Sequence, residues 1–270
     1  MVNGTNPWTN NEPVHGISFY QYNLKGDLTQ YIGHTWNTWH LVPTSRPVIE
    51  PPDPKTLYKD VPGANGKLDL SEALNGYRLY ENRSGSIEFI VANGWKSWEL
   101  VYQSILNDLH GRRVFAILDD DPTWYYQGRI ALNQWKSDES HSTITFDYDF
   151  YPYKRELTSA DEDWLWDPFD FEYGVINEFD NISVGDTTEN PNGHIITIIG
   201  CSEPQPLSIN IISVANSDLG LTVHSGSIKY VKQGVGLHRY PDILITNGEN
   251  QISFDDTSGV ISIPYRRGLL

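Results

Sequence analysis

The sequence predicts a mainly β protein with a single α-helix in its N-terminal half. Short runs of β-branched and apolar residues recur at roughly ten-residue spacing between turn signals, and only one stretch has a strong helical period. The composition agrees, because aromatic residues make up 13% of the 270-residue chain, and 22 Gly and 16 Pro supply turns. In the C-terminal half, the spacing of the β runs is typical of an all-β sandwich or barrel.

The first hundred residues are expected to hold strands and long loops. GISFYQYN (16–23) and GSIEFIVAN (85–93) alternate in the way that strands do. TSRPVIEPPDPK (44–55) carries four prolines and is expected to form an extended arm, because proline cannot donate to a β ladder. PGANGKLDLSEALNGY (62–77) is expected to place turn glycines around a short helical piece.

One helix is predicted over SWELVYQSILNDLHG (97–111). Ser97 can cap its start and Gly111 can end it. Six apolar residues recur at helical spacing and share one face, which we expect to be buried in the core. These residues are Trp98, Val101, Tyr102, Ile105, Leu106 and Leu109.

Three consecutive aspartates, Asp119 to Asp121, stand between two predicted strands, RVFAILDD and WYYQGRIALNQWKS; STITFDYDFYPY follows as a third. A carboxylate cluster could hold Ca²⁺ or Mg²⁺. However, adjacent residues of a strand point to opposite faces, and the alternating carboxylates of an EF-hand are missing. Aspartate favours the start of a turn and Pro122 presets φ, so we predict a hairpin turn here.

Seven further β runs follow in the C-terminal part, separated by turn signals such as Asn247-Gly248 and Ser258-Gly259. They are GHIITIIG (193–200), LSINIISV (207–214), GLTVHSG (220–226), SIKYVKQ (227–233), DILITNG (242–248), NQISFDD (250–256) and GVISIPYRR (259–267).

The negative charge is unevenly distributed along the chain. The formal net charge is −16, and residues 1–157 carry 19 acids against 14 bases, whereas residues 158–270 carry 16 acids against 5 bases. We take this step in composition as a domain boundary, with one domain over 1–157 and a second over 158–270.

The acidic run over 161–189 contains ten acids and no Lys or Arg. A cation site is one interpretation, but such blocks are more often a solvated linker or face. Aromatic residues interleave with the acids and could form a sugar-binding platform or a strip that docks on a neighbouring domain or subunit. We favour docking, because large aromatic side chains anchor interfaces. The aromatic residues are Trp164, Trp166, Phe169, Phe171 and Tyr173.

Several protein classes are disfavoured by the sequence. Ordinary nucleic-acid binding depends on Lys and Arg, which are outnumbered here. Cys201 is the single cysteine, so an intrachain disulfide cannot form. The first residues lack the charged and apolar regions of a signal peptide, and no 18-residue apolar run predicts a membrane span.

Enzyme motifs are also missing from the sequence. The histidines lack zinc spacing, and neither a Gly-x-Ser-x-Gly elbow nor a Walker loop occurs. A pair of carboxylates could in principle serve a glycosidase, but nothing in the sequence selects one. We therefore expect no enzyme, with no catalytic, cofactor-binding or metal-ligating residues and no cofactor.

The N-terminal half nevertheless resembles a known family. DVPGANGKLDLSEAL (60–74) and LHGRRVFAILDDDPTWYYQGRI (109–130), together with ITFDYDFYPYK (144–154), resemble the distal tail protein (Dit) family of long-tailed (siphovirus) phages and prophages. The likeness covers about residues 36–157. The remainder resembles the family only in forming a β-rich second domain.

The resemblance implies an architecture and a structural role. It implies an N-terminal β-sandwich-like domain with one helix, which forms a homo-hexameric ring, and an outward C-terminal domain that is a galectin-like β-sandwich. Such a ring links the tail tube to the baseplate or tail-tip proteins and leaves a channel through which DNA passes. The protein would then be a virion component of the tail tip, assembled in the host bacterial cytoplasm.

Two irregular segments that carry the family likeness, residues 43–54 and 62–77, are expected at or near the subunit interface. Long loops rich in proline or glycine in a compact domain are usually functional. The residues predicted to lie at this interface are Pro47, Pro51, Pro52, Pro54, Gly63 and Gly66.

Two other functions stay open at this point. The chain could be a carbohydrate-binding module that attaches to a host cell-wall glycan, alone or in addition to the hub role. A glycan hydrolase with unrecognised carboxylates is the less favoured alternative.

Overall fold

A computed structural model shows two compact units, residues 1–154 and 155–269. The structure describes residues 15–22, 28–92, 94–137, 141–162, 177–185 and 195–270. Each unit has its own hydrophobic core. The predicted domains were 1–157 and 158–270, and the ring-forming and outward roles given to them remain predictions.

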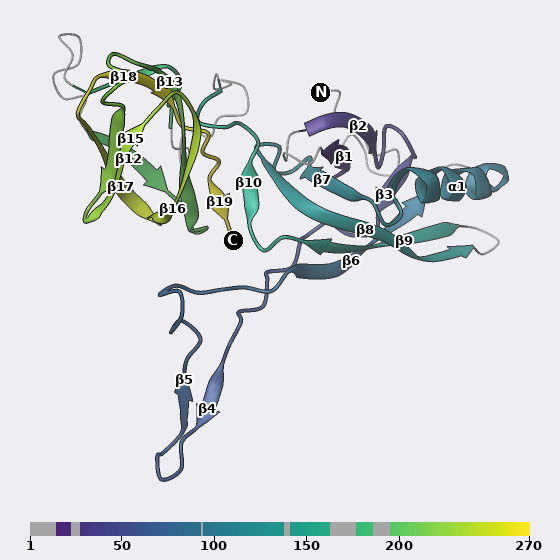
Figure 1. Cartoon of the computed structure of the whole chain (residues 1–270). Coiled ribbons are helices and arrows are strands. Elements are labelled where there is room, and N and C mark those ends of the chain that lie inside the picture. Colours follow the sequence, from purple (N-terminus) through teal and green to yellow (C-terminus); the bar gives the residue numbers. More distant parts are fainter. Residues whose placement is uncertain (1–14, 23–27, 93, 138–140, 163–176, 186–194) are drawn as a thin grey trace. The chain divides into compact units, whose positions relative to one another are not determined.

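The N-terminal unit is built on one antiparallel sheet in the order β2-β1-β7-β8-β9-β6-β3 (Figure 1). Its strands are β1 (Ile17–Tyr22), β2 (Leu28–His34), β3 (Leu41–Pro43), β6 (Arg83–Val91), β7 (Arg113–Leu118), β8 (Trp124–Ser137) and β9 (Ser142–Phe150). The chain returns from β2 to β3 through a turn in which Leu41 N donates to Thr35 O at 2.8 Å. The two edge strands of the sheet are therefore tied to each other.

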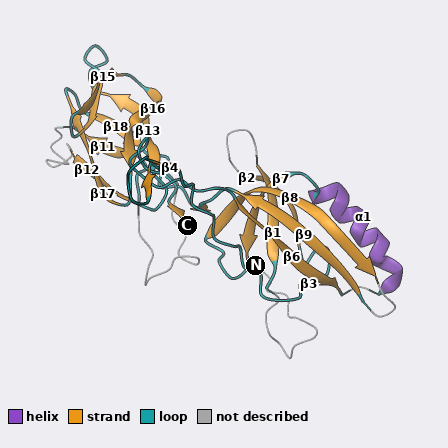
Figure 2. Ribbon diagram, turned by 90° about the horizontal axis from the view of Figure 1, so that it is seen from below, coloured by secondary structure: helices purple, strands orange, loops and turns teal. Residues whose placement is uncertain are grey.

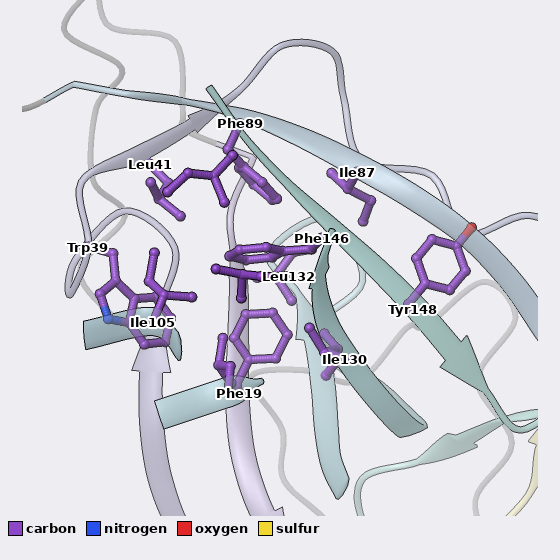
Figure 3. Packing of buried hydrophobic residues seen from close by; sticks show 14 of the residues in the cluster. Phe19, Trp39, Leu41, Ile87, Phe89, Ile105, Ile130, Leu132, Phe146 and Tyr148 are labelled. Carbon is purple, nitrogen blue, oxygen red and sulfur yellow. The ribbon is translucent and has the colours of Figure 1, made fainter. Parts of the chain in front are cut away.

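The sheet curls until its two halves face each other. Strands β1 and β9 are separated by β7 and β8, so a flat sheet would hold Phe19 and Phe146 about 14 Å apart, at the usual strand spacing. Their ring centroids are instead 6.4 Å apart, and those of Phe89 and Phe146 are 5.1 Å apart. Figure 3 shows Phe146 between Phe89 and Phe19. The facing halves pack as the layers of a sandwich do, which fits the predicted β-sandwich-like domain.

The predicted helix is present as α1 (Trp98–Leu109), preceded by the 3₁₀ turn η1 (Trp95–Ser97) (Figure 2). Its apolar stripe is buried at Trp98, Val101, Ile105 and Leu109, as expected from the helical spacing. Tyr102, which is partly buried, stacks on Trp135 of β8 with ring centroids 4.6 Å apart. The helix thus covers one end of the curled sheet.

Two local expectations were wrong. Ser97 stands at the N-cap but makes no side-chain cap, because its hydroxyl donates to Gly94 O at 2.8 Å. The short helical piece expected within 62–77 is absent: Lys67–Asp69 form strand β5, and turns follow. The Asp69 carboxylate accepts from the backbone N of Ser71 at 2.9 Å, which favours a turn over a continued helix.

The C-terminal unit is a sandwich of two four-stranded antiparallel sheets, β11-β18-β13-β16 and β12-β17-β14-β15. The strands are β11 (Ile182–Val184), β12 (Ile195–Gly200), β13 (Gln205–Val214), β14 (Leu221–Ser225), β15 (Ile228–Gln233), β16 (Gly236–Ile245), β17 (Gly248–Asp255) and β18 (Gly259–Ser262). Two further short strands, β10 (Lys154–Glu156) and β19 (Gly268–Leu269), pair with each other.

The interior of this sandwich follows from alternation along the strands. On β12, Ile196 and Ile198 are buried while Ile195 and Ile199 are exposed, and Leu207, Ile209 and Ile211 line the same core from β13. All seven predicted runs contain a strand. The short strands β11 and β19 were not predicted, because three-residue and two-residue strands carry almost no periodicity.

The mainly β fold class is confirmed, with α1 as the single α-helix of the described residues. In the same part of the chain, no helix is long and apolar enough to cross a membrane.

Candidate assembly surface

The N-terminal unit carries an arm over residues 44–82, between β3 and β6 (Figure 1). It contains a hairpin of β4 (Tyr58–Asp60) and β5 (Lys67–Asp69). Behind the hairpin the two sides of the arm stay paired, since Lys55 N donates to Leu79 O at 2.8 Å and Glu81 N to Asp53 O at 2.8 Å. The arm is therefore held together mainly by its backbone.

The apolar side chains of this arm are exposed. Leu74 is 95% exposed and Leu57 is 57% exposed, and every residue of β4 and β5 is exposed. A two-stranded hairpin is marginally stable at best in water when it packs on nothing. An exposed group of large apolar residues normally marks a contact with another molecule. The exposed apolar residues of the arm are Val48, Leu57, Tyr58, Val61, Leu68, Leu74 and Leu79.

The residues predicted at the subunit interface fall into two groups. Pro47 and Pro52 are buried within the N-terminal unit, so they support the arm from inside. The other four are exposed: Pro51, Pro54, Gly63 and Gly66. The two glycines lie in the tip of the hairpin with φ of 82° and 79°, a region that favours glycine.

The base of the arm is held by a buried arginine, which the sequence did not single out. Arg83, the first residue of β6, is 5% exposed, and its Nε donates to Pro152 O at 2.6 Å. Its Nη1 donates to Glu50 O at 3.3 Å, and its guanidinium lies 5.6 Å from the ring centroid of Tyr126. Burial lowers the pKa of this guanidinium, and the facing Tyr126 and Tyr148 oppose the shift.

Tyr148 also fixes the base of the arm. Its hydroxyl accepts a hydrogen bond from Glu50 N at 3.0 Å. Glu50 therefore uses both backbone groups to hold the arm, one to Tyr148 and one to Arg83. An arm with a fixed base and an exposed tip loses less conformational freedom when it binds.

The three aspartates lie in the turn between β7 and β8, so the predicted hairpin turn is confirmed. They do not converge on one point, and each carboxylate contacts a different segment. Asp120 contacts His15 Nδ1 at 2.7 Å and accepts from Arg46 Nε at 2.9 Å. Asp121 accepts from Lys154 Nζ at 2.5 Å. The turn ties the start of the arm and the end of the unit to the sheet.

Asp119 forms the innermost of these contacts, with the buried His34. Backbone N–H groups of Trp36 and Asn37 donate to His34 Nδ1 at 3.0 and 3.1 Å, so this nitrogen carries no hydrogen. Nε2 is then the donor, and it reaches the Asp119 carboxylate at 3.1 Å. The backbone around the β2–β3 turn thereby selects one tautomer of this histidine.

Replacing Asp120 with Asn should weaken the fold in a pH-dependent way. Partial burial raises the pKa of Asp120, but hydrogen bonds from His15 and Arg46 and their charges outweigh it, and the pKa is lowered overall. A lowered carboxyl pKa stabilises the folded state at pH values above the unfolded-state pKa of about 3.9. This stabilisation is lost as the pH falls through the folded-state pKa. The difference in unfolding free energy between wild type and variant, from denaturant titrations, should be present at neutral pH and shrink at low pH. An equal difference at both pH values would contradict this reading.

No group of three or more His, Cys, Asp or Glu side chains that could hold a metal occurs in the part of the chain that the structure describes. Most of the acidic run 161–189 lies outside the described residues, including the five aromatic residues from Trp164 to Tyr173 for which docking was predicted.

Comparison with solved structures finds a match that spans nearly the whole chain. It is the Dit protein (gp 19.1) of SPP1, described as a paradigm of hub adsorption apparatus in Gram-positive infecting phages. The match has a TM-score of 0.57, covers 94% of this chain and 99% of the SPP1 protein, and has 12% sequence identity.

The chain has the Dit fold. The resemblance seen in the sequence of the N-terminal half is confirmed at the level of the fold, and the fold match extends into the C-terminal half. The SPP1 protein is described as part of a phage hub adsorption apparatus. No protein-family model matches the sequence, and no curated protein matches it significantly.

Proposed function

We propose that the chain is a structural hub protein of a phage tail tip and assembles into a homo-hexameric ring. The observation that carries the proposal is the coverage of the fold match: 94% of this chain corresponds to 99% of the Dit protein of SPP1. The correspondence therefore involves both units. The ring would link the tail tube to the baseplate or tail-tip proteins, and the chain would be part of the virion.

The arm is proposed as the main contact between neighbouring subunits. Its exposed apolar residues lie on a hairpin that is marginally stable alone, and its base is already rigid. Packing against a second copy would bury these residues. Pro51, Pro54, Gly63 and Gly66 would lie in this contact, whereas Pro47 and Pro52 would shape the arm from within.

A channel for DNA through the ring is part of the proposal. The total charge of −16 says little about the lining of this channel, because most of the excess negative charge lies in residues 158–270. Residues 1–157 carry 19 acids and 14 bases. The C-terminal sandwich is proposed as the outward, galectin-like domain. In its described part Phe179, Tyr240, Phe254 and Tyr265 are buried and Tyr230 is half-buried, so an exposed aromatic plane for a host glycan is not found there.

The mass of the assembled particle tests the proposal directly. Native mass spectrometry or light scattering of the full chain should show a particle of six 30.8 kDa copies. A chain that stays monomeric at high concentration would contradict the ring.

Changing the arm should lower the particle mass without unfolding the chain. Replacing Leu57, Leu68 and Leu74 with Ser removes exposed apolar surface and touches no core residue, so circular dichroism should show a folded chain while the ring dissociates. A matched control replaces Leu100, Ile195 and Leu219 with Ser, which are 71%, 53% and 52% exposed and lie off the arm. Rings of full size from the arm variant would place the interface elsewhere.

Deleting the hairpin over residues 58–69 is the stronger form of the same test. A deletion of 47–54 would be less informative, because it removes the buried residues Pro47, Ile49 and Pro52 and so alters the core. The hairpin deletion removes only exposed residues.

A further inference from the structure

The C-terminal sandwich has a second surface that its own fold leaves uncovered. Strand β15 lies at the end of one sheet and β16 at the end of the other, and a short loop joins them. Among the described residues, β15 pairs only with β14, and β16 pairs only with β13. Residues 228–239 of these strands and their loop are called the β15–β16 edge below.

The β15–β16 edge differs in charge from the unit that carries it. Residues 158–270 contain 16 acids and 5 bases, and three of those bases, Lys229, Lys232 and Arg239, lie on this edge. No Asp or Glu occurs between residues 219 and 241. All three basic side chains are exposed. An acidic unit thus carries three of its five bases on its two neighbouring edge strands.

Apolar side chains are interleaved with these cations. Val231, Val235 and Leu237 are 60%, 64% and 62% exposed. Lysine on an edge strand commonly protects against unwanted strand pairing, and that role alone would explain Lys229 and Lys232. It does not explain three large apolar residues beside them, which increase the tendency of an edge to bind another chain.

Side-chain contacts hold the edge in one shape. The hydroxyl of Tyr230 on β15 donates to the Asp242 carboxylate on β16 at 2.7 Å, and the rings of Tyr230 and Tyr240 meet edge-on with centroids 4.9 Å apart. His238 Nε2 on β16 lies 2.7 Å from Gly234 O in the loop. A surface that is ordered before binding loses less entropy when a partner arrives.

We propose that the β15–β16 edge binds an acidic, apolar polypeptide segment of a partner protein. The cations match acidic side chains, and the three apolar residues match apolar ones. The unpaired strand edges offer backbone hydrogen bonds that an extended polypeptide can complete as a regular ladder, as in β-augmentation. A polysaccharide or a nucleic acid lacks the repeating amide groups for such a ladder. The inference goes beyond the ring, because it concerns a surface of the C-terminal unit whose binding is measurable whatever the state of assembly.

Selection from a library of random peptides on the immobilised full-length chain tests this proposal. The net charge of −16 repels acidic peptides in general, so an acidic bias in the selected sequences would point to a local basic surface. We expect the selected peptides to be rich in Asp, Glu and apolar residues, and their affinity to fall as salt is added.

Two variants and two controls locate the binding. Lys229→Glu with Lys232→Glu should weaken peptide binding by about tenfold or more, and Val235→Ser with Leu237→Ser should do the same. The charge control is Arg113→Glu with Lys136→Glu, and the apolar control is Ile212→Ser with Leu219→Ser; all four residues are exposed and lie off this edge. Neither control should change the affinity, and circular dichroism should show every variant folded.

Several results would overturn the proposal. The proposal would be contradicted if the selected peptides showed no acidic bias, or if they bound the edge variants as tightly as the wild type. A selection that enriches no peptide would also contradict it. Polyphosphate that displaces the peptides at equal charge concentration would indicate a site for anionic polymers. Self-association that the Val235→Ser and Leu237→Ser variant abolishes would make the edge a contact between copies.

Discussion

Ile105→Asp is expected to prevent stable folding of the N-terminal unit. Ile105 is 0% exposed on α1 and belongs to the core cluster that also contains Trp39 and Leu41 (Figure 3). Loss of a buried isoleucine side chain alone costs about 2–5 kcal/mol. A carboxylate without a partner in that core adds a desolvation cost of several kcal/mol. The total rivals the ~5–15 kcal/mol by which whole domains are stable.

Thermal unfolding followed by near-ultraviolet circular dichroism measures this effect. Leu100→Asp is the matched control, since Leu100 lies on the same helix but is 71% exposed, and it should leave the melting temperature nearly unchanged. If the Ile105 variant melted like wild type, α1 would have to be peripheral to the core.

Gly128→Ala is expected to have the second large effect, at the centre of the same sheet. Gly128 lies in β8, opposite Phe150 of β9. A methyl group at this position would stand 2.1 Å from the backbone O of Asp149 and 2.6 Å from the Cα of Phe150. Both neighbours are backbone atoms of a paired strand and cannot rotate away, so the strands must separate. Overpacking of this kind costs about 1–3 kcal/mol or more.

The midpoint of denaturant unfolding gives the size of this loss. Gly94→Ala serves as the control, because a methyl group there meets no atom within 4 Å, and alanine should be neutral or slightly stabilising. A Gly128 variant as stable as wild type would show that β8 and β9 tolerate a wider spacing.

Local signals were sufficient for much of the architecture. Alternation along strands, one helical stripe and turn residues depend only on neighbours in the chain, so α1, the hairpin turn at Asp119–Asp121 and the seven C-terminal β runs were predictable. The short helix expected within 62–77 was wrong, because a few residues with mixed signals can satisfy either a turn or a helix.

The candidate surfaces were only partly predictable. Proline and glycine marked the arm, but Leu57, Leu68 and Leu74 look in the sequence like ordinary core residues of a short strand or helix. Likewise, Val231 and Leu237 are apolar strand residues of a type that is usually buried. Which side of a strand meets a core depends on the opposite sheet, and the sequence does not contain that information locally.

The sequence alone determined that this chain is mainly β, that it has one amphipathic helix, and that its negative charge is concentrated after residue 157. Only the tertiary structure decided how the N-terminal sheet curls to bring Phe19 against Phe146, how Arg83 and Tyr148 hold the arm, and which apolar residues stay exposed. The physical reason is the range of the interactions. Periodicity and turn preference act over a few residues, whereas curvature, burial and the pairing of buried polar groups depend on residues far apart in the chain.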